Sequence, residues 1–155
     1  MEILYRLLPL RFALLGLVAF LSNSVAADEL KLNALLVWGT NELKPEGKDF
    51  KPLPEELRNG LRPLRWKNYY VVKTEGVVAS KKVNKVVLSE RCTLTVQKVA
   101  PNQVETQLFN PLSPTPNKPV FGQRLDFKDG HRHAIAGDSK DNWDDAWAVY
   151  LVPAE

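Results

Sequence analysis

Cysteine is nearly absent from this 155-residue chain, in which Cys92 is the only one. A single cysteine excludes an internal disulfide framework, so hydrophobic burial has to stabilise the folded chain. At strand periodicity Leu94 and Val96 share the side of Cys92. We therefore expect its thiol to be buried and unreactive.

The motifs of the common catalytic sites are also missing. The chain has no Gly-x-Ser-x-Gly elbow, no P-loop and no Gly-x-Gly-x-x-Gly turn. The sequence predicts no cofactor and favours a non-catalytic protein. A nucleophile assembled from residues that are distant along the chain stays open.

Long apolar runs are missing after residue 27, so residues 28–155 are not expected to contain a stable membrane span. Residues 1–27 have the pattern of a signal peptide: Arg6 and Arg11, an apolar run over 12–21, and small residues over 22–27. Cleavage after Ala27 fits best, with Ala26 as the second choice. The sequence thus predicts an exported protein, periplasmic or extracellular, and an uncleaved anchor is the alternative.

One β-rich domain is expected over residues 28–155, because β-branched and aromatic residues dominate and turn signals recur. Pro101-Asn102 predicts a hairpin, and Asp129-Gly130 predicts a turn that joins two further strands. The run from Ala146 to Val152 is almost entirely apolar and predicts a central strand buried on both faces. A polar loop is expected before it, over 137–144. The expected strands are 30–38, 66–73, 83–88, 92–99, 104–109, 120–127, 131–136 and 146–152.

A short helix is expected near 54–61, with Pro54 in its first turn and Gly60 at its end. Leu57, Leu61 and Leu64 are spaced to pack it on a core. Seven or eight short strands with one helix predict a β-sandwich or a small barrel. An α+β roll is the alternative.

Basic residues concentrate between Arg62 and Lys98. This segment contains nine lysines and arginines but only two acidic residues, Glu75 and Glu90, although the whole chain has a formal net charge of only +3. Aromatic residues lie among these bases, a mixture that suits stacking beside an anionic contact. Since export argues against nucleic acid, an acidic polymer or protein of the cell envelope is the expected partner. The alternative is that the aromatic residues belong to the core and the lysines protect a strand edge. The predicted binding residues are Trp66, Tyr69, Tyr70, Lys81, Lys82 and Lys85.

His131 and His133 form the second candidate site. On a strand both imidazoles would point to one side, within reach of a shared metal ion, and Asp126 or Asp129 could supply a carboxylate. Two ordinary histidines are the alternative reading.

Three short segments resemble a group of small exported bacterial proteins of unassigned function. They are Trp38-Gly-Thr-Asn41, Trp66-Lys-Asn-Tyr69, and Ala136-Gly-Asp138 with Asp144-Asp-Ala-Trp147. The resemblance covers most of residues 28–155. It implies a bacterial envelope context but no activity and no site residues.

Three functions are therefore considered. The first is an exported, non-catalytic β-domain that binds a protein or polymer of the envelope. The second is a metal-binding protein or metal-dependent enzyme using His131 and His133. The third is an accessory subunit of an exported assembly, in which an exposed Trp38 or Trp143 would be covered by the partner. The sequence leaves the oligomeric state open.

Overall fold

The structure is a computed structural model, and it describes residues 29–43, 46–64, 66–140 and 146–155. Residues 1–27, with the expected signal peptide, lie outside the described part, as does Trp143. No helix in the described ranges is long and apolar enough to cross a membrane.

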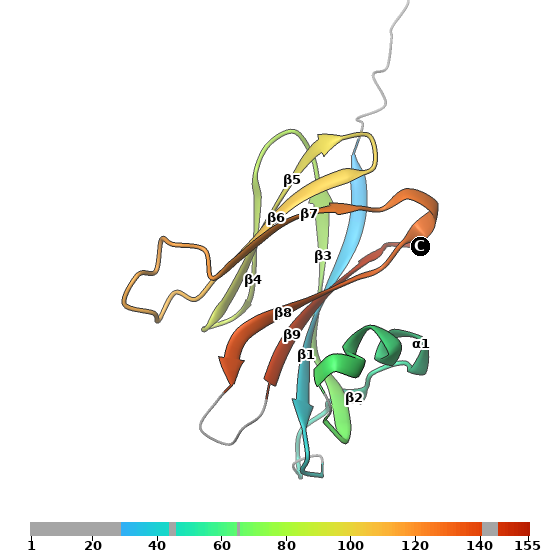
Figure 1. Ribbon diagram of the computed structural model, residues 1–155, viewed down its shortest axis with the longest axis vertical. Helices are drawn as coiled ribbons and strands as arrows, with labels where there is room; N and C mark the ends of the chain where they lie inside the picture. Colours follow the sequence, from blue (N-terminus) through green and yellow to red (C-terminus); the bar gives the residue numbers. More distant parts are fainter. Residues whose placement is uncertain (1–28, 44–45, 65, 141–145) are drawn as a thin grey trace, which may run out of the picture.

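The fold is mainly β, as the sequence predicts, and consists of two antiparallel sheets (Figure 1). The five-stranded sheet has the order β2-β3-β1-β9-β8, and the four-stranded sheet has the order β4-β5-β6-β7. Neither sheet closes on itself within the described residues, so the β-sandwich alternative is confirmed over the barrel. The strands are β1 (Leu30–Thr40), β2 (Lys51–Pro52), β3 (Asn68–Ala79), β4 (Asn84–Ser89), β5 (Cys92–Ala100), β6 (Gln103–Phe109), β7 (Phe121–Asp126), β8 (His133–Lys140) and β9 (Ala146–Pro153).

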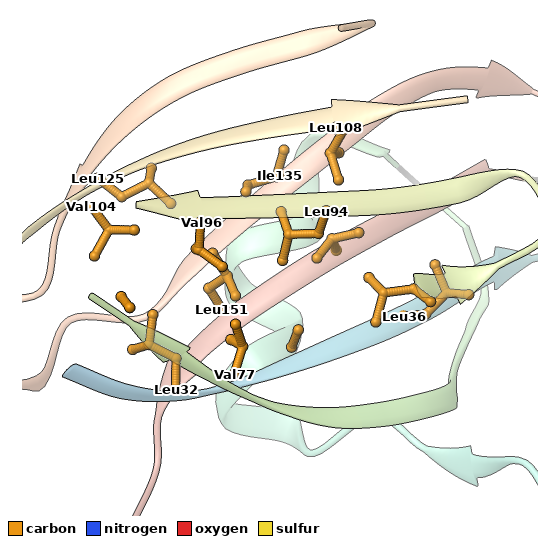
Figure 2. Packing of buried hydrophobic residues seen from close by; sticks show 14 of the residues in the cluster. Leu32, Leu36, Val77, Leu94, Val96, Val104, Leu108, Leu125, Ile135 and Leu151 are labelled. Atoms are coloured by element: carbon orange, nitrogen blue, oxygen red, sulfur yellow. The ribbon is translucent and has the colours of Figure 1, made fainter. Parts of the chain in front are cut away.

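The main core lies between the two sheets. Figure 2 shows its side chains, with Leu32 and Leu151 contributed by the five-stranded sheet and Leu94 and Val104 by the four-stranded sheet. Leu94, Val104 and Leu151 have no exposed surface. Apolar residues such as Leu94 on β5 and Val104 on β6 alternate with polar ones along their strands. Each of these two strands therefore has one buried face.

A second core lies on the other face of the five-stranded sheet, beneath the helical segment. That segment comprises α1 (Glu55–Arg58) and the 3-10 helix η1 (Asn59–Leu64). Leu57 and Leu61 pack there against Val37 and Tyr150. The central strands of this sheet are therefore buried on both faces, and the prediction of a two-sided strand over 146–152 is confirmed by β9.

Two expectations about the helix and the turns change in detail. The helical segment continues past Gly60, which lies inside η1 rather than at the end of the helix. Asp129 and Gly130 do form a turn, with φ of 58° and 73°. However, β7 and β8 belong to different sheets, so this turn carries the chain across the sandwich.

Strand ends also differ from the expected ranges. β3 continues from the expected end at 73 to Ala79, because it pairs with β1 along its whole length. β8 extends to Lys140, into the expected polar loop over 137–144. The two-residue strand β2, paired with β3, was not expected.

Candidate functional site

The turn between β3 and β4, residues 80–83, carries the predicted basic residues. Lys81 and Lys82 are exposed on the turn, and Lys85 is exposed near the start of β4. This turn also passes the chain from the five-stranded to the four-stranded sheet. We call Lys81, Lys82 and Lys85 together the basic turn.

Side-chain hydrogen bonds hold the main chain of the basic turn. The Asn84 amide donates to the carbonyl oxygen of Val78 at 2.6 Å and to the Ser80 hydroxyl at 3.1 Å. From β5, the Gln97 amide donates to the carbonyl oxygen of Lys81 at 2.9 Å. The backbone N–H of Lys98 donates to the carbonyl oxygen of Ser80 at 2.7 Å. The turn is thus tied to its own strands and to β5, and its lysines project from a fixed main chain.

The charges of the basic turn are not compensated by ion pairs with the described residues. Some surface cations elsewhere are paired: Lys73 lies 2.9 Å from a Glu75 carboxylate oxygen, and Arg132 lies 3.1 Å from one of Glu56. No such pair involves Lys81, Lys82 or Lys85 within the described ranges. Their positive potential is available to an external anion.

Trp66 and Tyr69, predicted as binding residues, lie on the helix side of the five-stranded sheet. Tyr69 is 7% exposed and belongs to the second core, against which Trp66 packs. The Tyr69 hydroxyl accepts from the Trp66 backbone N–H at 3.1 Å and donates to the carbonyl oxygen of Leu61 at 3.4 Å. A Cβ added at Gly39 would lie 3.1 Å from the Tyr69 ring. These contacts join the helical segment to the sheet.

Tyr70 points to the opposite face and takes part in a row of aromatic rings. Its ring centroid is 5.9 Å from that of Trp38, which lies 6.3 Å from that of Trp147 at an interplanar angle of 22°. Phe50 meets Trp38 edge-on at 6.1 Å. The row follows the strand register, since Trp38 pairs with Tyr70 on one side and with Trp147 on the other. Trp38 is 9% exposed, so the expectation that it is an exposed contact residue is wrong.

The structure does not bring the predicted aromatic residues and the lysines together. Tyr69 and Tyr70 lie at the start of β3, and Lys81 and Lys82 follow its end. At about 3.3 Å per residue the strand separates them by roughly 30 Å.

The two histidines have different surroundings. β8 begins at His133, so His131 precedes the strand, where it is exposed. His133 Nε2 lies 2.6 Å from the carbonyl oxygen of Asp126. Since a carbonyl only accepts, Nε2 carries the proton in this bond. The His133 ring also meets Phe127 edge-on at 4.8 Å.

The carboxylates proposed to complete a metal site have other local roles. Asp126 accepts from the Lys128 backbone N–H at 2.8 Å, and Asp129 forms the turn. Within the described residues no group of three or more His, Cys, Asp and Glu side chains could hold a metal ion.

Cys92 is half-buried at the edge of the main core. Burial raises the pKa of its thiol to about 11. At neutral pH the thiol is therefore protonated. The expectation of a buried thiol is met in part, since Cys92 is half-buried, and its low reactivity stays a prediction.

The residues that hold the basic turn were not predicted from the sequence. Asn84 carried a usable signal, because asparagine beside a turn commonly bonds to nearby backbone groups. Gln97 carried none, since its contact to the Lys81 carbonyl depends on how β5 lies beside the turn.

The fold and this site define an antiparallel β-sandwich with a basic turn at one end. No protein-family model, curated protein or solved structure matches the chain.

Proposed function

We propose that this chain is an exported, non-catalytic β-sandwich that binds an acidic component of the cell envelope, a protein or a polymer, through the basic turn. Export is inferred from the signal-peptide pattern of residues 1–27. The mature protein would then work in the periplasm or outside the cell.

One observation supports the binding proposal above all: the three lysines lack ion-pair partners in the described structure and project from a hydrogen-bonded turn. A turn that is already ordered loses little conformational entropy on binding. Uncompensated positive charge attracts an acidic partner and makes the association sensitive to salt.

The test uses residues 28–155 with an acidic polysaccharide, polygalacturonate, and a neutral one, dextran. We expect binding to polygalacturonate alone, weakening as salt is added. The variant Lys81→Glu, Lys82→Glu, Lys85→Glu should lose it.

A matched triple variant controls for total charge. Lys48, Lys51 and Lys67 are exposed and lie elsewhere on the surface, and their replacement by glutamate changes the net charge equally. If both triple variants lose binding to the same extent, or if neither does, the assignment of the site to the basic turn is wrong.

A further inference from the structure

The chain enters the sandwich beside the basic turn. Leu30, the first residue of β1, pairs with Ala79, the last residue of β3, and Lys31 pairs with Val78. Figure 1 shows the start of β1 and the β3–β4 connection at the same end of the molecule. Any segment that precedes residue 29 is therefore attached at the end that carries the basic turn.

Exposed apolar side chains gather at this same end. Val83, on the turn, is 60% exposed, Val99 at the end of β5 is 39% exposed, and Val78 is 38% exposed. The hydrogen bond from Lys98 to Ser80 holds the end of β5 against the turn. Lys31 adds an exposed cation at this end. Two exposed acidic residues lie there as well: Glu29, and Glu155, which follows Ala154, whose backbone N–H donates to the carbonyl oxygen of Lys31 at 3.0 Å.

We infer that the partner of the basic turn is the anionic lipid face of the membrane that bounds the envelope. This inference rests on the proposed function, because it keeps the basic turn as the binding site and an acidic envelope component as the partner, and it names a lipid surface in place of a protein or polymer. Exposed lysines and exposed small apolar side chains at one end of a molecule suit a lipid surface, because headgroups attract the charges and the interface takes up the valines. A hydrated acidic polymer would use the lysines but would gain little from Val83.

The covalent link between the apolar run over 12–21 and β1 also favours an orientation in which the basic turn faces the membrane. Eight residues, 22–29, link the apolar run over 12–21 to Leu30, and a fully extended chain of that length spans at most about 28 Å. While the apolar run is in the membrane during export, the attached end of the sandwich has to stay near the bilayer. After cleavage the lysines and valines would hold the domain there reversibly.

The experiment measures partition of residues 28–155 into phosphatidylcholine vesicles with and without phosphatidylglycerol. We expect binding only where the anionic lipid is present. Each lysine contributes about a fivefold gain in partition, so the triple glutamate variant of the basic turn should lose 100-fold or more. The variant Lys48→Glu, Lys51→Glu, Lys67→Glu should lose much less. Circular dichroism of both variants checks that they fold.

A second variant separates a lipid surface from an acidic polymer. Val83→Ser should weaken partition into phosphatidylglycerol vesicles several-fold and leave polygalacturonate binding unchanged, and Val120→Ser, at another exposed valine, should change neither. Binding to polygalacturonate without binding to vesicles overturns the lipid inference and leaves the proposed function standing. Binding to neither overturns both, and vesicle binding that both triple variants lose equally overturns the assignment to the basic turn.

Discussion

Position 60 requires a glycine because the Tyr150 hydroxyl occupies the space that a larger residue needs. A Cβ added there would lie 2.5 Å from the hydroxyl oxygen. The same hydroxyl donates to the carbonyl oxygen of Leu57, in the turn of helix before Gly60. Gly60 was expected at the end of the helix, but a glycine is needed here because of this close approach between the helical segment and β9.

The variant Gly60→Ala should therefore lower the free energy of unfolding by about 1–3 kcal/mol, the usual cost of overpacking. Urea denaturation measures it. Gly76→Ala is the matched control, since a Cβ added at Gly76 meets nothing within 4 Å. Equal stability changes in the two variants would show that the Tyr150 contact is not the cause.

At the scale of elements, the helical segment is a covering layer of the five-stranded sheet. Leu57 is 6% exposed and packs with Val37 and Tyr150 beneath it. Truncation of a buried leucine removes its contacts and leaves a cavity.

We expect Leu57→Ala to lower the free energy of unfolding by about 2–5 kcal/mol. Leu43→Ala, the same substitution at a side chain that is 84% exposed, should change it by less than about 0.5 kcal/mol. Thermal or urea unfolding of both variants gives the comparison. A small effect at Leu57 would mean that the segment does not contribute to the folded core.

Element types could be predicted from the sequence more fully than their partners. Period-two alternation in β5 and β6 and the apolar run of β9 are local patterns that a sheet requires. β3 shows where prediction from local sequence ends: Glu75 and Gly76 have low strand propensity, yet pairing with β1 keeps this part of the chain extended. The assignment of β7 and β8 to different sheets is also not local, because an Asp-Gly turn is the same whether or not its strands pair.

The candidate site was also only partly predictable, because local sequence does not determine which side chains share a surface. Trp66, Tyr69, Tyr70 and the lysines are neighbours in sequence, but alternate residues of a strand face opposite sides. Tyr69 and Tyr70 are divided between the two faces of the sheet for that reason. Of the predicted binding residues, the exposed Lys81, Lys82 and Lys85, which follow β3, remain as the candidate binding surface.

On the scale of the whole molecule, the thiol of the half-buried Cys92 and the hydroxyl of the buried Tyr150 make the free energy of unfolding depend on pH in the alkaline range. Burial raises the pKa of Cys92 from 9.0 to about 11, and burial with the nearby Tyr69 raises that of Tyr150 from 10.0 to about 12. The unfolded chain therefore releases these protons at lower pH than the folded one. The stabilisation that the two protonated groups give the folded state is fully present below pH 9.0 and is lost as pH rises toward 12.

The free energy of unfolding should thus fall as pH rises above 9.0. Cys92→Val removes the thiol and should flatten the first part of that fall, which urea titrations between neutral pH and about pH 11 would detect. An identical pH profile in the variant would contradict a contribution from Cys92.

The pairing of β1 with β9 has a consequence for how the chain assembles. These two strands come from opposite ends of the described sequence, yet they lie side by side at the centre of the five-stranded sheet. Contacts between residues so far apart in sequence form slowly, because a long loop has to close first. The sheet cannot be completed before β9 has joined it. A polypeptide threaded across a membrane from its N-terminus, as proposed, would remain translocation-competent until its final strand had passed through.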